Sequence, residues 1–307
     1  MLDLVDVLVG HIVDGSLIAF LIIIGGLAYA AKQRILMSQA IIVVNFVIFF
    51  LLMLTSPTLS FSTAQSTVFK ELAFQPSYLQ DIPQLYTLFT SMFVHANFLH
   101  ILMNMIVFLL VGVPFEQRIG STRFFVLYVA TGVIGALLFT LFNLDSTVAL
   151  VGASGAIFGI LGSFAALYPR DQVVMPLPVF IVLFIRMPVI VATLVFAGME
   201  TLYVFSPVAD NVAHLAHIGG LVSGIFLAVL VGKPPDITTK RLPLDRLASI
   251  VTTDREREVL ERVRAADEPE VQEAWLSTLL RELECPECGG TLVHHNHIVC
   301  RRCGWHP

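Results

Sequence analysis

The chain has 307 residues, of which 56% are hydrophobic and 13% are charged, and its mean hydropathy is +0.83. A chain this apolar is not a water-soluble globular protein throughout. The charge is also uneven, because 23 of the 41 Asp, Glu, Lys and Arg residues lie in residues 234–307. We therefore expect a membrane-embedded body followed by a soluble tail.

The body contains apolar segments of the length that crosses a bilayer, which is roughly 20 residues. They predict an all-α polytopic membrane protein with a six-helix bundle and a probable extra N-terminal helix. The six expected spans are 39–55, 94–114, 122–142, 149–168, 187–206 and 213–232, and the extra span is 16–31.

The basic residues of the short loops fall on one side of the membrane when these spans alternate. The positive-inside rule makes that side cytoplasmic, so we expect a multi-pass cell membrane protein with a cytoplasmic C-terminus. With seven spans the N-terminus lies outside, and Asp3, Asp6 and Asp14 argue against a signal peptide. The basic residues are Lys32, Arg34, Arg118, Arg123, Arg170, Arg186, Lys233, Lys240 and Arg241, and the opposite loops hold Lys70, Glu71, Asp81, Asp145 and Asp210.

Three of the expected spans carry polar side chains near their outer ends, in one shallow layer. A lone serine in a membrane helix is usually a packing residue, but ionisable residues in a bilayer are costly and tend to mark function. A serine and several ionisable side chains at the same depth therefore favour a functional site. The polar residues are His95, His100 and Asn104 on the first span, Ser154 on the second, and His214 and His217 on the third.

Small residues explain how these helices could approach each other. Gly152 and Gly155 flank Ser154, and Gly220 and Gly224 form a small-xxx-small pair on the helix of His217. Close approach of the two helices is needed for a hydrogen bond between Ser154 and His217. Phe158, one turn after Ser154, is placed to pack against the imidazole of His217, although a core or lipid contact is its ordinary interpretation.

Four motifs in order resemble the rhomboid intramembrane serine proteases over about residues 83–232. They are Gly152-Ala153-Ser154-Gly155, His95-x4-His100-x3-Asn104, Glu116-Gln117-Arg118-Ile119-Gly120 and Ala216-His217-x-Gly219-Gly220. Each motif is weak alone, but the ordered set is specific. The resemblance implies a serine endopeptidase that cuts transmembrane segments of membrane proteins near the outer face, with the bilayer as its environment and no catalytic cofactor.

Site roles follow from the resemblance. It implies Ser154 as nucleophile, His217 as general base and acid, His100 and Asn104 as oxyanion-stabilising residues, and His95 in a supporting role. The family pattern is a Ser–His dyad, so Glu200 is interpreted as an outer-end polar contact and packing is expected to orient His217. A proteolytically inactive, rhomboid-like protein that binds membrane clients is the alternative.

Two positions outside the expected catalytic layer also bear on the fold. Many family members carry a Trp-Arg pair where this chain has Tyr86-Thr87, which affects how the outer loop sits in the membrane. Glu116 and Arg118, at the cytoplasmic end of their helix, predict an ion pair beside a turn at Gly120.

The tail carries an independent signal. Cys285-Pro-Glu-Cys288 and Cys300-Arg-Arg-Cys303 form two Cys-x-x-Cys pairs that use all four cysteines of the chain. This pattern predicts a Cys₄ structural zinc site, and a reducing cytoplasm disfavours disulfides. The histidines between the pairs are expected to be exposed loop residues, and they are His294, His295 and His297.

The segment before the cysteines predicts two amphipathic helices, the first starting with a Thr253–Glu256 capping box. Its charges are mixed in sign, which favours a solvated face over a nucleic-acid patch, and the sequence does not choose between a cytoplasmic protein partner and nucleic acid for the ribbon. The expected domains are an N-terminal helix and turn at 1–38, a rhomboid-like domain at 39–233, a helical linker at 234–284 and a zinc ribbon at 285–307.

Overall fold

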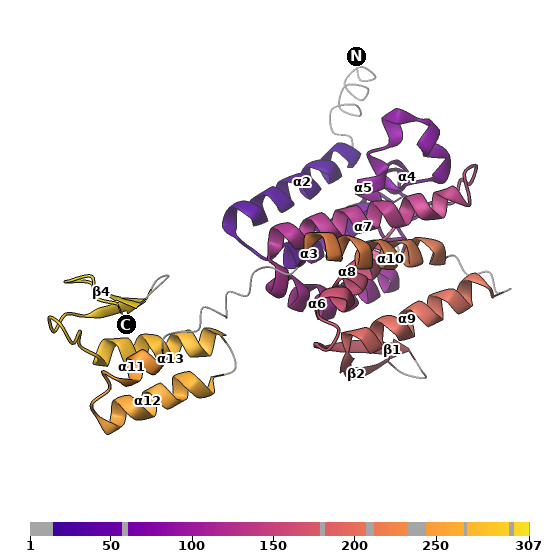
Figure 1. Ribbon diagram of the computed structural model, residues 1–307. Helices are drawn as coiled ribbons and strands as arrows, with labels where there is room; N and C mark the ends of the chain where they lie inside the picture. Colours follow the sequence, from indigo (N-terminus) through magenta and orange to yellow (C-terminus); the bar gives the residue numbers. More distant parts are fainter. Residues whose placement is uncertain are drawn as a thin grey trace, which may run out of the picture. The chain divides into compact units, whose positions relative to one another are not determined.

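The computed structural model describes residues 15–56, 61–178, 182–206, 212–232, 244–266, 269–294 and 298–306. The chain divides into two compact units, Met1–Lys233 and Pro234–Pro307, and each is described by itself (Figure 1). Several residues used in the sequence analysis lie outside the described ranges. They are Asp3, Asp6, Asp14, Asp210, Lys233, Lys240, Arg241, His295 and His297.

Among the described residues of the first unit, five helices are long and apolar enough to cross a membrane, so the protein is a multi-pass membrane protein. Their mean hydropathies lie between 1.8 and 2.4, well within the range of spanning segments. The five are α2 (Gly15–Gln33), α3 (Met37–Leu54), α6 (Phe98–Ile119), α7 (Ser121–Leu141) and α10 (His214–Val231).

Two further apolar helices are shorter than the spans expected for them. α8 is Ser154–Leu167 and α9 is Val189–Val204, whereas the sequence predicted 149–168 and 187–206. At ~1.5 Å per residue, the 14 residues of α8 extend only about 21 Å. Ten of them are buried, so neighbouring protein rather than lipid surrounds most of this helix.

The connection from α3 to α6 holds short helices rather than an open loop. They are α4 (Thr67–Leu72), η1 (Pro76–Gln80), η2 (Ile82–Gln84), α5 (Thr87–Thr90) and η3 (Ser91–Phe93). Ser66 caps α4 by accepting a hydrogen bond from Phe69 N–H, and Thr90 Oγ1 donates to Leu72 O over 2.9 Å. The first bond caps α4, and the second joins α5 to α4.

A β-hairpin lies between α8 and α9, and the all-α prediction did not include it. β1 (Gln172–Pro178) and β2 (Val182–Pro188) pair antiparallel, with Gln172 opposite Pro188 and Met175 opposite Ile185. Val173 and Met175 are buried whereas Gln172 is exposed and Val174 half-buried, which is close to the two-residue period of a strand.

Glu116 and Arg118 do not pair with each other, so that prediction was wrong. The buried Glu116 carboxylate accepts hydrogen bonds from Met37 N–H at 2.6 Å and Ser38 N–H at 2.7 Å, at the start of α3. Arg118 instead contacts Asp171 at 2.9 Å. A helix N-terminus leaves backbone N–H groups unpaired and favours negative charge, which explains why the carboxylate lies there.

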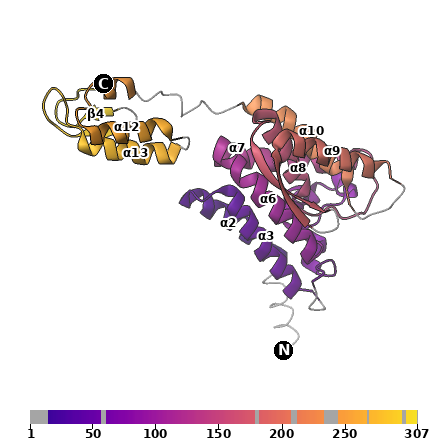
Figure 2. The ribbon, with the colours of Figure 1, turned by 90° about the horizontal axis from the view of Figure 1, so that it is seen from below.

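α8 lies inside the bundle, with α10 packed along it (Figure 1, Figure 2). The two backbones are in contact at glycines: a Cβ added to Gly220 would lie 2.0 Å from Gly155 O, and one added to Gly224 would lie 2.0 Å from Gly159 O. Ser163 Oγ also donates to Gly224 O over 2.9 Å. Side chains larger than hydrogen would therefore separate the two helices.

Gly224→Ala is expected to lower the free energy of unfolding by about 1–3 kcal/mol, the cost of overpacking. The added Cβ would clash with the backbone carbonyl of Gly159, which cannot rotate away as a side chain can. Thermal unfolding in detergent measures the change. Gly198→Ala in α9 is the matched control, because its Cβ would meet open space. Equal midpoints for the two variants would contradict this packing.

Candidate active site

Ser154 is the first residue of α8, and the chain enters it through a buried, well-paired segment. Gly152 N–H donates to Ser91 O over 3.0 Å, and Ala153 N–H donates to His95 Nε2 over 3.4 Å. Leu150 exchanges backbone hydrogen bonds with Phe74. A non-helical backbone at membrane depth must be satisfied by protein, and these partners do so. Ser154 is thus held at a helix start without exposing its backbone to lipid.

The hydroxyl of Ser154 and the imidazole of His217 are in direct contact. Their Oγ and Nε2 atoms share a hydrogen bond of 2.7 Å between α8 and α10, within the reach that a nucleophile and its base require. Phe158 stacks on His217, with ring centroids 4.6 Å apart and planes 8° apart. The imidazole is thereby held on its flat face, and it is 9% exposed.

Glu200 lies on the other side of that imidazole, which the sequence analysis did not anticipate. Its Oε2 atom is 3.1 Å from His217 Nδ1 and 2.6 Å from His214 Nδ1. The contact to His214 is a hydrogen bond; that to His217 is an ion-pair distance, although the ring N–H is not aligned on the oxygen. Glu200, interpreted from the sequence as an outer-end polar contact, thus lies beside the imidazoles of both histidines.

One sequence signal pointed to Glu200. It is the sole charged residue in the 16 residues of α9, and a charge in a spanning helix is a functional hypothesis by default because its burial is costly. The sequence could not reveal its partner, since Glu200 and His217 lie on different helices and their contact depends on how α9 packs against α10.

His95 and His100 lie together beside the backbone that precedes Ser154. Their ring centroids are 4.9 Å apart, and a Cβ added to Gly152 would lie 2.8 Å from His100 Nε2. The imidazole of His100 therefore faces the backbone that leads into Ser154. His95 is fully buried and accepts from Ala153 N–H, so it supports that backbone directly.

Asn104 is one helical turn after His100, and its amide is engaged within its own helix. Nδ2 donates to His100 O over 2.9 Å. An amide nitrogen carries two hydrogens, so this bond leaves one for another acceptor. The structure thus brings His100 toward Ser154 and places Asn104 beside it, with part of its donor capacity already used.

The start of α8 adds backbone donors to the site. The first N–H groups of a helix have no intrahelical acceptor, and the helix dipole makes that end electropositive. Ala153 provides no side-chain cap here, and the first bond of the helix runs from Ile157 N–H to Ala153 O. Ser154, Gly155 and Ala156 therefore present backbone N–H groups where negative charge on a bound carbonyl oxygen would be stabilised.

Tyr86 and Thr87 are held by backbone carbonyls of the connection between α3 and α6. Tyr86 OH donates to Glu71 O over 2.9 Å, and Thr87 Oγ1 donates to Gln84 O over 2.6 Å. Thr87 is fully buried, whereas Tyr86 is exposed. The pair that departs from the family pattern therefore fixes this connection to α4 and η2.

The four cysteines of the second unit form one cluster. Cys285 Sγ is 3.6 Å from Cys303 Sγ, Cys288 Sγ is 3.5 Å from Cys300 Sγ, and all four lie within 4.8 Å of one another. A disulfide would need about 2.05 Å. Zn–S bonds of ~2.3 Å arranged as a tetrahedron separate the sulfurs by about 3.8 Å, so the cluster has dimensions that fit a tetrahedral metal ion.

The cysteine cluster lies beside a short hairpin and three helices. β3 (Leu292–His294) and β4 (Ile298–Cys300) pair antiparallel, and α11 (Leu244–Ala248), α12 (Asp254–Ala265) and α13 (Pro269–Glu282) precede them. The predicted capping box is confirmed, because Thr253 and Glu256 exchange side-chain to backbone hydrogen bonds. Backbone N–H groups of Thr253, and then of Thr252, lower the pKa of Glu256.

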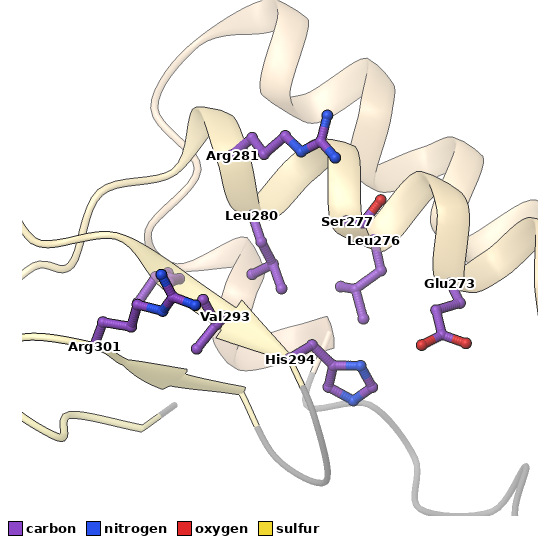
Figure 3. Close-up of a pocket in the computed structure, with 9 residues that line it drawn as sticks. Glu273, Leu276, Ser277, Leu280, Arg281, Val293, His294 and Arg301 are labelled. Atoms are coloured by element: carbon purple, nitrogen blue, oxygen red, sulfur yellow. The ribbon is translucent and has the colours of Figure 1, made fainter.

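A hollow between α13 and the β3–β4 hairpin has an apolar floor and a charged rim (Figure 3). Leu276 and Leu280 point from α13 toward the hairpin, and His294 lies near one end. The expectation of an exposed loop was wrong for His294, which is half-buried in β3. The residues lining the hollow are Glu273, Leu276, Ser277, Leu280, Arg281, Leu292, Val293, His294 and Arg301.

The fold and site define a multi-pass membrane protein in which a half-buried serine and a buried histidine are hydrogen-bonded between two helices. Residues 83–234 match the model of the rhomboid domain. The chain belongs to the rhomboid family.

The sequence is also similar to known rhomboid proteins. The chain is 32% identical over 144 residues to RHOMBOID-like protein 1 of Arabidopsis thaliana, covering 47% of this chain and 34% of that protein. It is 34% identical over 155 residues to RHOMBOID-like protein 7 of the same plant, covering 48% and 43%. Rhomboid protease GluP of Bacillus subtilis is 32% identical over 149 residues, covering 48% and 26%. The match thus spans less than half the length of each relative.

Gly152→Ala is expected to destabilise the protein by about 1–3 kcal/mol, through strain and overpacking. Gly152 has φ of +110°, which side chains rarely adopt, and the added Cβ would lie 2.8 Å from His100 Nε2. Thermal unfolding in detergent measures this. Gly155→Ala is the control, because its Cβ would make an ordinary contact at 3.6 Å; an unchanged midpoint for Gly152→Ala would contradict the geometry.

Proposed function

We propose that this protein is an intramembrane serine endopeptidase that cleaves transmembrane segments of other membrane proteins. The observation that carries the proposal is the 2.7 Å hydrogen bond between Ser154 Oγ and His217 Nε2, in a chain whose helices are apolar enough to span a bilayer. Membership of the rhomboid family and similarity to a relative named as a rhomboid protease support it.

In the proposed reaction, Ser154 Oγ attacks the carbonyl carbon of the scissile peptide bond while His217 Nε2 takes its proton. The tetrahedral intermediate collapses as His217 returns that proton to the leaving amine, which leaves an acyl-enzyme on Ser154. Water, deprotonated by His217, then attacks the ester and releases the carboxylate product. The contact between Oγ and Nε2 allows both proton transfers without a movement of the helices.

Three groups of hydrogen-bond donors are proposed to stabilise the negative charge that develops on the carbonyl oxygen. The backbone N–H groups at the start of α8 contribute, together with His100, which faces Gly152, and the remaining amide hydrogen of Asn104. Each such donor is typically worth ~10²–10³ in rate. The short α8 supports this assignment, because a helix that starts inside the bundle can aim its N-terminus at a substrate within the membrane layer.

We further propose that the site opens toward the outer face and that the second unit is cytoplasmic. Three arginines support this orientation. Arg118 lies in the last turn of α6, Arg123 lies in the first turn of α7, and Arg170 follows the end of α8. Basic residues in short loops mark the cytoplasmic side. The protease domain is assigned to residues 39–233, with 1–38 as an added N-terminal helix and turn.

Replacing Ser154 with alanine should abolish cleavage, because no other hydroxyl is hydrogen-bonded to His217 among the described residues. The measurement is proteolysis of a single-span membrane protein in liposomes, followed by mass spectrometry of the fragments. Ser223→Ala in α10 is the matched control, since Ser223 Oγ donates to Gly220 O of its own helix and has no other hydrogen-bond partner within the described ranges. Equal cleavage by Ser154→Ala, or none by the wild type, would contradict the proposal.

We also propose that the four cysteines bind one structural Zn²⁺ ion in a ribbon at residues 285–307, preceded by a helical linker at 234–284. Their sulfur separations support a tetrahedral site. A protein partner for this ribbon stays a prediction.

Metal analysis of protein purified without chelator is expected to give about one zinc per chain, since one Cys₄ set binds one ion. Cys285→Ser should lose the metal and expose the remaining thiols to alkylation. Ser277→Ala, on the neighbouring helix α13, should keep both properties. Metal-free wild-type protein with four reactive thiols would remove the zinc site from the account.

A further inference from the structure

Glu200 is a buried carboxylate in an apolar helix, and it must be stabilised there. A charge in a spanning segment is costly unless it is paired, and Glu200 is 9% exposed. Its Oε2 atom lies 2.6 Å from His214 Nδ1 and 3.1 Å from His217 Nδ1. One oxygen thus contacts two imidazoles that lie three residues apart on α10.

The same imidazole of His217 makes both contacts that matter for catalysis. Nε2 bonds Ser154 and Nδ1 lies beside Glu200. We infer that Glu200 is a positioning residue that holds the Nδ1–H tautomer of His217, so that the Nε2 lone pair faces Ser154. The inference rests on the proposed function, and it extends a Ser–His pair to a Ser154–His217–Glu200 arrangement in the order of a catalytic triad.

The Glu200 carboxylate affects catalysis through the tautomer of His217. A neutral imidazole carries its proton on one nitrogen only, and Ser154 can be deprotonated only if Nε2 is the unprotonated one. A carboxylate beside Nδ1 accepts its N–H and also stabilises the imidazolium formed during attack. The N–H group of Nδ1 is not aligned on the carboxylate oxygen at 3.1 Å, and catalytic hydrogen bonds often become aligned only in the transition-state complex.

His214 has a separate part in this arrangement, because it fixes the carboxylate. Its Nδ1 bonds Glu200 Oε2 at 2.6 Å, and its ring stacks on Tyr203 with centroids 5.0 Å apart and planes 8° apart. Tyr203 lies three residues after Glu200 on α9, so these two contacts of His214 go to the same helix. His214 thereby joins α9 to α10 next to the base.

The distances favour hydrogen bonds over a metal ion held by the same three groups. Their ligand atoms lie within 4.8 Å of one another. Ligands at ~2.0–2.1 Å from a tetrahedral zinc are about 3.3 Å apart. The oxygen and nitrogen of Glu200 and His214 are closer than that, at 2.6 Å, which is the separation of a direct N–H···O contact.

The test measures kcat and KM for cleavage of a single-span substrate by full-length wild type, Ser154→Ala, Glu200→Gln and Glu200→Asp in liposomes. Glu200→Gln keeps the shape but can donate to Nδ1 and so hold the wrong tautomer. It should lower kcat by roughly 10²-fold or more, with ~10⁴-fold as the loss in a soluble triad, and change KM less than about two-fold. Glu200→Asp keeps the charge and should recover at least about tenfold over Glu200→Gln.

Thr201→Val, at the next position of α9, is the matched control, because Thr201 Oγ1 donates to Ala197 O of its own helix and to no other acceptor in the described part of the chain. Thermal unfolding of each variant separates misfolding from lost positioning. Should Glu200→Gln fail to fold, Glu200→Asp decides, since its shorter side chain should lower kcat about tenfold at unchanged KM.

Wild-type kcat in the variants of Glu200 that fold, with Ser154→Ala inactive, would overturn the inference and leave the proposed function standing. Equal losses in Glu200→Gln and Thr201→Val would also overturn it, as an effect of α9 in general. An inactive wild type would instead overturn the proposed function itself.

Discussion

The contact between α8 and α10 is the constraint on which the rest of the site depends. Ser154 Oγ and His217 Nε2 come within 2.7 Å only because the two backbones pack glycine against carbonyl at Gly220 and Gly224. Association of membrane helices relies on close van der Waals packing, since lipid provides little hydrophobic driving force between them. The same glycines therefore stabilise the bundle and set the distance between nucleophile and base.

Placing a nucleophile inside a membrane also requires that the chain enters the helix without unpaired backbone groups. The segment before Ser154 meets this requirement through Phe74, Ser91 and His95. It explains why α8 is short: five residues predicted as helix form a paired connection instead. The uncapped start of α8 then supplies donors to the site rather than to its own cap. The residues at the start of α8 therefore both pair the entering backbone and provide hydrogen-bond donors to the site.

Much of the fold and of the candidate site could be predicted from the sequence. Helix positions followed from apolar length, and the helices of Ser154, His217, His100 and Asn104 followed from motifs with fixed spacing. Contacts between helices could not be predicted in this way. Glu200 was interpreted as an outer-end polar contact because its partner is on another helix, and Glu116 was paired with its neighbour in sequence although its partners are the first N–H groups of α3. The β1–β2 hairpin was missed because an apolar run beside a membrane span has no clear period.

The central claim is that Ser154 is a nucleophile activated by His217. Mass spectrometry of the detergent-solubilised protein after treatment with a fluorophosphonate, which modifies activated serines, tests it most directly. The account predicts one adduct on the peptide that contains Ser154, absent in His217→Ala at an unchanged unfolding midpoint. No adduct on folded wild-type protein, or an adduct on another serine that persists in His217→Ala, would contradict it.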